Sequence, residues 1–206
     1  MLVYHISKEI INYFIKELDF SYTIMCMEVV RYKDSPSIKK DIILLLKEAF
    51  PSNERPPVSI FFTNVENRKE NELFGYFVDG RFIGFSYLSH YKDICYIFFL
   101  AVKKEERNKG YGTKILDLIK KDNKDYVLLL CHEEVDEKYD DYESRVKRRD
   151  FYTKNSFADN GYKTNEFGVI FETRFYGSHP VPFEDYRELY GLGFSEYAKK
   201  HIFKVS

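Results

Sequence analysis

Tryptophan is absent from the 206-residue sequence, and cysteine occurs only three times, at Cys26, Cys95 and Cys131. The cysteines are far apart and form no C-x-x-C pair. An odd and sparse cysteine count speaks against a disulfide framework and favours a reducing compartment.

Long hydrophobic runs are also missing. The longest, at residues 94–102, has nine residues, whereas a helix needs about 20 to cross a bilayer. Lys8 and Glu9 interrupt the apolar stretch near the N-terminus, so that stretch lacks the apolar core of a signal peptide. These absences predict a soluble, cytoplasmic protein.

Neither sign of charge dominates, because 32 Lys and Arg face 33 Asp and Glu, for a net charge of −1. A dedicated nucleic-acid binder usually carries a basic excess, so no nucleic-acid partner is expected. Hydrophobic residues make up 44% of the chain, including 18 Tyr and 19 Phe, which is enough for a sizeable core. The length favours a single domain.

Hydrophobic periodicity and turn residues divide the chain into helices and strands. Asp79-Gly80 predicts a tight hairpin between two strands, and the prolines within residues 51–57 exclude regular structure there. The predicted elements are a helix at 5–19, a β-rich stretch at 23–32, a helix at 38–50, strands at 72–78, 81–89 and 94–102, a helix at 111–121, a strand at 126–131, a helix at 142–155, two strands within 162–175, and a helical tail over 182–202 that breaks at 191–193.

This order, a meander of strands followed by crossover units, predicts a mixed sheet with helices on both faces. The sequence shows no internal repeat and no low-complexity linker.

The segment from 100 to 113 joins the most apolar strand to a helix and contains an R-x-x-G-x-G pattern at Arg107, Gly110 and Gly112. Glycines allow a tight turn, and the free N–H groups at a helix N-terminus bind phosphate oxygens. A pyrophosphate could therefore bind here, although a simple glycine turn with solvated charges is the alternative. No Walker A motif is present, and Ile115 replaces the third glycine of the dinucleotide-binding pattern.

This segment resembles the acetyl-CoA-binding motif of the GNAT family of N-acetyltransferases, whose pattern is R/Q-x-x-G-x-G/A. A second resemblance lies at residues 149–157, R-D-F-Y-T-K-N-S-F. In the family, the corresponding helix commonly ends in aromatic-Tyr-x-Lys/Arg-Asn-Gly-Phe, and here Ser156 replaces the glycine. The order of elements is similar to that of the family over about residues 25–174.

The resemblance implies an α/β (α+β) fold with a mixed, mostly antiparallel central sheet of about six to seven strands, flanked by helices on both faces. It divides the chain into an N-terminal helical extension (1–22), a GNAT-like acetyltransferase domain (23–177) and a C-terminal helical tail packed on the same domain (178–206). The implied activity is direct transfer of an acetyl group from acetyl-CoA to a primary amine. The alternatives are a non-catalytic acyl-CoA-binding or regulatory module, and an interaction protein whose glycine turn is incidental.

The resemblance also implies roles for individual residues in binding the cofactor. The backbone of the strand would pair with the pantetheine arm, the loop N–H groups would hold the pyrophosphate, the Thr113 hydroxyl would assist, and Asn155 would lie near the CoA arm. The implied cofactor-binding residues are Leu100, Ala101, Val102, Arg107, Asn108, Lys109, Gly110, Tyr111, Gly112, Thr113 and Asn155.

Tyr152 would act as the general acid that protonates the departing thiolate. Many family members carry a glutamate on the preceding strand as general base, but residues 95–102 contain no carboxylate, and Tyr96 and Phe98 occupy the positions in question. Glu54, next to the proline-rich loop, is the chosen candidate for the base. Glu48, Glu133 and Glu134 are the other candidates.

His132-Glu133-Glu134 invites a metal-site interpretation, but H-E-x-x-H is absent, so no metal is expected. Balanced charge gives no electrostatic preference for a cationic or anionic acceptor. A polyamine, an aminoglycoside, an amino acid and a protein amine all stay open as acceptors. No membrane partner is expected, and the oligomeric state is open, with a homodimer as one option.

Overall fold

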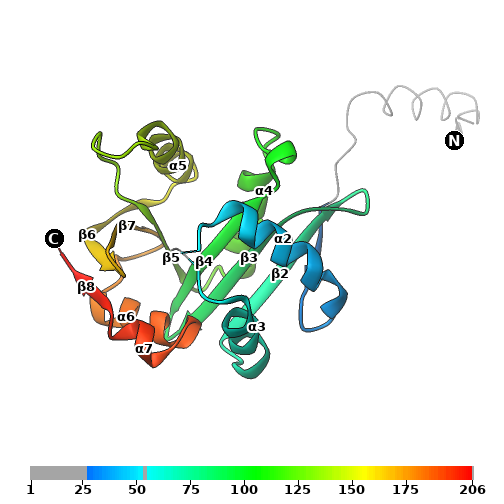
Figure 1. Ribbon diagram of the computed structural model, residues 1–206, viewed down its shortest axis with the longest axis horizontal. Coiled ribbons are helices and arrows are strands. Elements are labelled where there is room, and N and C mark those ends of the chain that lie inside the picture. The colour runs from blue at the N-terminus through cyan, green and yellow to red at the C-terminus, as the bar shows by residue number, and fades with distance from the viewer. Residues whose placement is uncertain (1–26, 53–54, 206) are drawn as a thin grey trace, which may run out of the picture.

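One eight-stranded sheet forms the centre of the computed structural model, which describes residues 27–52 and 55–205. The strand order is β1-β2-β3-β4-β5-β7-β6-β8 (Figure 1). Neighbouring strands are antiparallel except β4 and β5, which are parallel. The strands are β1 Met27–Arg31, β2 Asn71–Val78, β3 Arg81–Tyr91, β4 Ile94–Val102, β5 Val127–Glu133, β6 Ala158–Glu166, β7 Val169–Tyr176 and β8 Ile202–Lys204.

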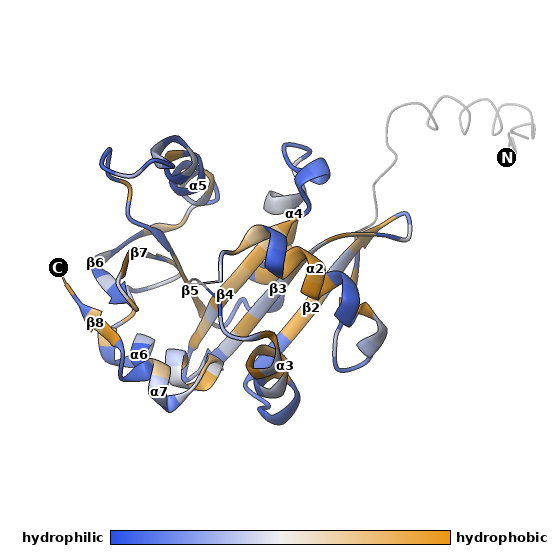
Figure 2. Cartoon of the chain, viewed as in Figure 1, coloured by the Kyte–Doolittle hydropathy of each residue, from blue (hydrophilic) through white to orange (hydrophobic). Residues whose placement is uncertain are grey.

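Helices cover both faces of this sheet. One face packs on α2, α3 and α6, and the other packs on α4, with α5 at its edge. Figure 2 shows the central strands as the most hydrophobic part of the fold, whereas α5 is hydrophilic. The helices are α2 Lys39–Ala49, α3 Val58–Asn67, α4 Tyr111–Asp122, α5 Tyr142–Lys154, α6 Phe183–Gly193 and α7 Glu196–Lys199, with short 3-10 turns at Pro36–Ile38 and Lys104–Glu106.

A β-bulge in β4 changes which side chains face which layer. Ile97 is paired with Leu88, and Phe99 is paired with the next residue, Tyr87, so Phe98 is the extra residue. Tyr96 and Phe98 pack in the cluster under α6, and Phe99 packs with α2 and α3 on the same face. The bulge therefore places two successive residues, Phe98 and Phe99, on one side of the sheet and bends the strand.

Strands β4 and β5 separate soon after they begin. Their pairing consists of three residue pairs, the last of which joins Tyr96 to Leu129. Beyond this point, the edge of β4 that faces β5 pairs with no strand in the described part of the chain. An opening therefore divides the sheet between residues 97–102 of β4 and residues 130–133 of β5.

The C-terminal end of α6 is held tightly beside the bulge. The last carbonyls of a helix have no intrahelical partner, and here four side chains from α3, β2, β3 and the α3–β2 turn supply donors. Arg68 adds a positive charge at the negative end of the helix dipole. The donors are Asn64 Nδ2, Arg68 Nη1, Asn71 Nδ2 and Tyr87 Oη, and the acceptors are the carbonyls of residues 191–194, at 2.6–3.0 Å.

Most of the predicted elements are confirmed, and the Asp79-Gly80 turn has φ values of 51° and 71°, as a type I′ hairpin requires. The expected helix at 5–19 lies outside the described residues. Two predictions were incomplete. No element was predicted at 58–67, where α3 forms, and the sheet has eight strands rather than six to seven. The additional strand, β8, belongs to the tail that was expected to be helical, and it forms because β6 offers an unpaired edge at residues 164–166.

Two glycines of α6 should respond in opposite ways to alanine. A Cβ at Gly193 would lie 2.1 Å from Phe98 Cε2, so Gly193→Ala should lower the free energy of unfolding by about 1–3 kcal/mol. At Gly191 the nearest atom is the flexible Lys199 Cδ, at 3.0 Å, and Gly191→Ala should be neutral or stabilise by up to about 1 kcal/mol. Urea denaturation of both variants measures the difference, and equal effects would contradict the close packing of α6 on the bulge.

Candidate functional site

The loop that follows β4 ends in a helix whose N-terminus has no side-chain cap. Gly110 is the N-cap residue of α4, with φ at 82°, and Asn108 also has a positive φ, 62°. Because the N-cap residue is a glycine, it has no side chain that could cap the first turn of the helix. Because first-turn N–H groups have no earlier helical carbonyl to bond, those of Gly112 and Thr113 are directed beyond the end of the helix, where they can donate to an anion.

Positive charge at this loop comes mainly from Arg107. Its Nε donates to the carbonyl oxygen of Val102 at 3.0 Å, which fixes the guanidinium beside the end of β4. Lys109 was expected to add charge, but its Nζ lies 2.8 Å from Glu106 Oε2 and holds the pKa of that carboxyl below its usual range. Arg81 lies 3.8 Å from the same carboxylate.

Helix α5 packs directly on the first turn of α4. A Cβ at Gly112 would lie 3.0 Å from Phe151 Cζ, so a larger residue here would require the Phe151 ring to shift. Asn155 is buried and donates through Nδ2 to the Phe151 carbonyl at 2.8 Å and to Thr113 Oγ1 at 3.4 Å. The structure therefore brings Asn155 to the predicted loop, where it ties α5 to α4.

Tyr152 lies beside β5, near the opening in the sheet. Its ring stacks on His132 with centroids 6.0 Å apart and also contacts Phe157. Burial raises the pKa of Tyr152 to about 12, with a smaller raising contribution from Cys131, although Arg148 lowers it. Within residues 27–52 and 55–205, the Tyr152 hydroxyl makes no hydrogen bond. This hydroxyl keeps its proton at neutral pH and is available to a ligand.

His132 is buried and neutral. Its Nε2 accepts a hydrogen bond from Arg174 Nε at 2.8 Å, and its Nδ1 lies 2.9 Å from the Glu133 carbonyl oxygen, to which it donates. Burial lowers the pKa of His132 to about 4, and the neighbouring Arg174 acts in the same direction. Both ring nitrogens are engaged, so the metal interpretation of this segment finds no support in its geometry.

Of the four carboxylates that the sequence suggested as bases, two are engaged in ion pairs, one is exposed on a helix, and one is outside the described residues. Glu54 is among the residues that the structure does not describe. Glu133 forms an ion pair with Arg148. Glu134 lies 2.9 Å from Lys138 Nζ and 3.0 Å from Lys163 Nζ, and these lysines lower its pKa. Glu48 is exposed on α2.

The structure reveals a buried carboxylate that the sequence analysis missed. Glu166, at the end of β6, is 6% exposed and accepts hydrogen bonds from Tyr186 and from Thr164 Oγ1. The hydroxyl of Tyr186 lies 3.4 Å from that of Tyr96, on β4. The alternation of Tyr162, Thr164 and Glu166 along a strand was the available signal, because it places all three side chains on one face.

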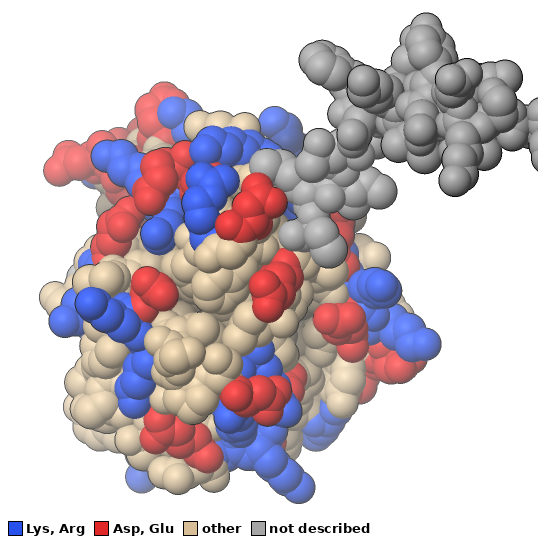
Figure 3. Space-filling model, turned by 90° about the vertical axis from the view of Figure 1, so that its right-hand side faces the viewer, with Lys and Arg blue, Asp and Glu red and all other residues tan. Residues whose placement is uncertain are grey.

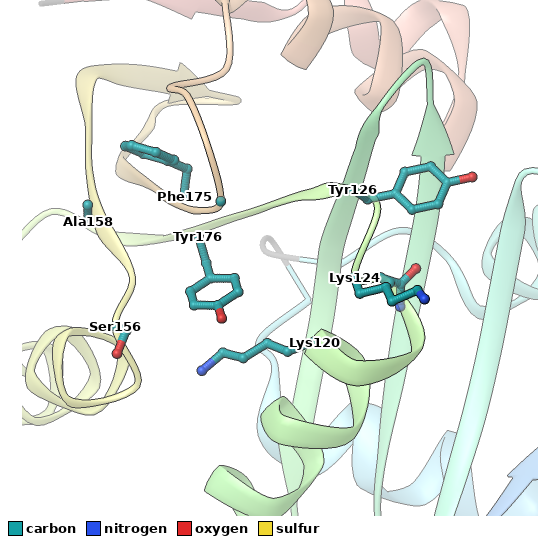
Figure 4. Close-up of a pocket in the computed structure, with 9 residues that line it drawn as sticks. Lys120, Lys124, Tyr126, Ser156, Ala158, Phe175 and Tyr176 are labelled. Atoms are coloured by element: carbon teal, nitrogen blue, oxygen red, sulfur yellow. The ribbon is translucent and has the colours of Figure 1, made fainter.

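A surface pocket of about 520 Å³ lies at the other end of α4 (Figure 4). Lys120 lies in its wall, where its Nζ donates to the Asn155 carbonyl at 2.8 Å and is 4.6 Å from the centroid of the Tyr176 ring. The 12 residues of α4 span about 18 Å. The pocket is therefore separate from the loop at the N-terminus of that helix.

One face of the surface shows how the charged side chains are distributed. On the face shown in Figure 3, acidic and basic side chains are interspersed rather than gathered by sign. In the described ranges, no helix has the length and apolar character needed to span a membrane.

Comparison with known proteins agrees with this arrangement. The sequence pattern of the Acetyltransferase (GNAT) family matches residues 40–155. A search of curated proteins finds no match.

Solved structures share the fold at low sequence identity. A GNAT-family acetyltransferase from Elizabethkingia anophelis with acetyl-CoA bound is 19% identical, with a TM-score of 0.55 and coverage of 74% of this chain and 98% of that one. An aminoglycoside 6'-N-acetyltransferase in complex with coenzyme A is 16% identical, with a TM-score of 0.59 and coverage of 75% and 99%. The ribosomal-protein-S18-alanine N-acetyltransferase of Escherichia coli is 14% identical, with a TM-score of 0.54 and coverage of 77% and 100%.

The match to the family pattern spans more than half of the chain, and it includes β4, the uncapped start of α4, and α5. The chain belongs to the GNAT family of acetyltransferases.

Proposed function

We propose that this protein transfers an acetyl group from acetyl-CoA to a primary amine by direct attack of the amine on the thioester. The observation that carries the proposal is the opening between β4 and β5, together with the loop at residues 103–109 that connects the unpaired end of β4 to the glycine-capped N-terminus of α4. An unpaired strand edge and a phosphate-binding helix end are the two features that a pantetheine arm and a pyrophosphate require.

The cofactor would lie along this path. The backbone of residues 100–102 offers N–H and C=O groups to the amide groups of the pantetheine arm. The carbonyl of Val102 already accepts from Arg107, so Leu100 and Ala101 supply the freer part of the edge. The first-turn N–H groups of α4 and the guanidinium of Arg107 would bind the pyrophosphate oxygens, with the Thr113 hydroxyl beside them.

Tyr152 would supply the proton in the transfer step. The amine nitrogen bonds to the carbonyl carbon, the carbon–sulfur bond breaks, and the sulfur leaves with the electron pair and takes the Tyr152 proton. The nitrogen then releases one proton, which restores the Tyr152 hydroxyl, so the products are a neutral amide and a thiol. A thiol has a pKa of about 8.5, and the pKa of Tyr152 is raised to about 12. The hydroxyl is therefore protonated at every pH at which the reaction would run, and it can donate to the sulfur as negative charge develops.

The division of the chain stays a proposal as well, with the transferase domain over 23–177 and the tail on the same domain. The acceptor is left open by the neighbouring structures, since one acts on an aminoglycoside and another on a ribosomal protein. A non-catalytic acyl-CoA-binding module would bind acetyl-CoA but release no thiol with any amine, so turnover separates it from the enzyme.

Calorimetric titration with acetyl-CoA tests the cofactor site. The wild-type protein should bind acetyl-CoA and not ATP or NAD, and Gly110→Glu should weaken binding at least tenfold, because the added carboxylate repels the pyrophosphate. Gly168→Glu is the matched control. Gly168 also has a positive φ, 92°, and open space where a Cβ would be, so it carries the same backbone cost away from the loop. Equal affinity of both variants would contradict the loop assignment.

Substitution of Tyr152 tests the proton donor. Tyr152→Phe should lower kcat by about 100-fold or more and leave the dissociation constant of acetyl-CoA within twofold, as measured by thiol release and calorimetry. Tyr142→Phe, at the first residue of the same helix, is the control and should keep wild-type turnover. A Tyr152→Phe variant with full kcat would remove this tyrosine from the mechanism.

A further inference from the structure

A chain of hydrogen-bonding groups leads from the opening in the sheet to a buried carboxylate. Cys131 Sγ lies 2.9 Å from Tyr96 Oη, and Tyr96 Oη lies 3.4 Å from Tyr186 Oη. Tyr186 donates to Glu166 Oε1. The four groups come from β5, β4, α6 and β6, so four separate elements converge to form the chain.

The outer end of this chain is at the proposed reaction site. Cys131 lies two residues beyond Leu129, the last residue of β5 that pairs with β4. It is half-buried, whereas Tyr96 and Tyr186 are 1% and 0% exposed. His132, the next residue along β5, stacks on the ring of Tyr152. The chain and the proposed proton donor therefore border the same opening.

The inner end is a carboxylate without a counter-charge. In the part of the chain that the structure describes, no Lys, Arg or His forms an ion pair with Glu166. A buried charge without a partner is costly, and three hydroxyl donors, from Tyr186, Thr164 and Tyr190, only partly offset that cost. Such a group is poised to accept a proton.

We propose that Cys131, Tyr96 and Tyr186 form a proton relay that carries the proton of the acceptor ammonium to the carboxylate of Glu166. This proposal rests on the proposed function, and it supplies the base that β4 lacks. An ionised carboxylate only accepts hydrogen bonds, so Tyr186 donates to Glu166, Tyr96 donates to Tyr186, and the Cys131 thiol donates to Tyr96. Every hydrogen bond in this series is therefore donated in the direction of Glu166.

The transfer is balanced. The ammonium gives one proton to the Cys131 sulfur as the thiol proton moves to Tyr96. Tyr96 passes its own proton to Tyr186, and Tyr186 passes one to Glu166. The acceptor is left as a neutral amine, Glu166 as a neutral carboxylic acid, and each relay group with as many protons as before. The proton returns to solvent by the reverse path after the product leaves.

The groups around Glu166 determine the direction in which its pKa is shifted. Burial raises the pKa of Glu166, and the hydroxyls that donate to it lower it. The residues directly opposite Glu166, Val169 on β7 and Ile202 on β8, are uncharged. The charged group on this face of β8 is Lys204, which lies opposite Thr164 with its Nζ 5.4 Å from the centroid of the Tyr162 ring. The titratable groups that face it are Tyr186 and Tyr190 of α6, Tyr96 of β4, Cys131 of β5 and Tyr162 of β6.

The pH profile of kcat/KM tests the relay. The acceptor is the amine that the wild-type protein acetylates fastest among spermidine, kanamycin and an alanine-terminated peptide. Glu166→Gln and Tyr96→Phe should lower kcat/KM at pH 7 by about 100-fold or more. The deficit should shrink as the pH approaches the pKa of the amine, because the acceptor is then already deprotonated. A purely structural role would give a deficit that does not depend on pH.

Matched variants separate the relay from packing. Tyr162→Phe removes a hydroxyl from the same apolar cluster but outside the relay, and it should keep the wild-type profile. Cys131→Ser keeps a proton-carrying atom and should retain most of the activity that Cys131→Ala loses. Tyr96→Phe leaves the donors to Glu166 in place, so it tests the relay even if Glu166→Gln fails to fold.

The outcomes are distinguishable. A pH-independent deficit, or no deficit, in Tyr96→Phe overturns the relay while the acetyltransferase activity stands. A wild-type protein that binds no acetyl-CoA, or acetylates none of the three amines, contradicts the proposed function and the relay with it.

Discussion

The early separation of β4 from β5 is the constraint on which the rest of this structure depends. Where a parallel pair of strands stops pairing, the backbone N–H and C=O groups beyond the last residue pair lose their partners. Here the bulge at Phe98 turns β4 away after three residue pairs. The polar edge left exposed lies between the apolar clusters on the two faces of the sheet. The backbone N–H and C=O groups along that edge pair with no strand, so they can form hydrogen bonds with a ligand that contains amide groups.

The bulge is stable because the C-terminal end of α6 supports it. Phe98 packs against Tyr96, Tyr190 and Phe194, and Gly193 lies so close that only a glycine fits. The position of α6 is fixed in turn by Arg68 and other donors from α3 and β2 to its last carbonyls. Helix α6, near the end of the chain, therefore fixes the geometry of β4, in the middle of the chain. The C-terminal tail thus helps to form the opening.

The sequence predicted local features well and long-range ones poorly. The hairpin at Asp79-Gly80 and the loop before α4 were predictable because turn chemistry and glycine spacing are local. The spacing of Val58, Phe61, Phe62 and Val65 is that of one helix face and indicates α3, although no element was predicted after the prolines of residues 51–57. The strand β8 has only three residues, too few to show a period, and it exists because β6 offers an edge.

For the candidate site the same division holds. The loop residues and Tyr152 form local motifs, and the structure brings them to one end of the opening. The chain of hydrogen-bonding groups that leads to Glu166 could not be predicted from the sequence. In that chain, Tyr96 and Cys131 are 35 residues apart, and Tyr96 and Tyr186 are 90 residues apart. Only the pairing of β6 with β7, and the packing of α6 beneath them, brings these hydroxyls into a chain.

The two faces of the sheet thus place a proton donor and a proton acceptor on opposite sides of the same opening. On the α5 side, burial raises the pKa of Tyr152, so its hydroxyl keeps its proton at neutral pH. On the α6 side, burial without a cation makes Glu166 ready to take a proton. Acetyl transfer to an amine that arrives as an ammonium requires nitrogen to lose two protons, one to a base before the attack and one that balances the proton given to sulfur. A sheet that divides at this point can keep the two tasks apart, because the strands themselves separate the donor from the acceptor.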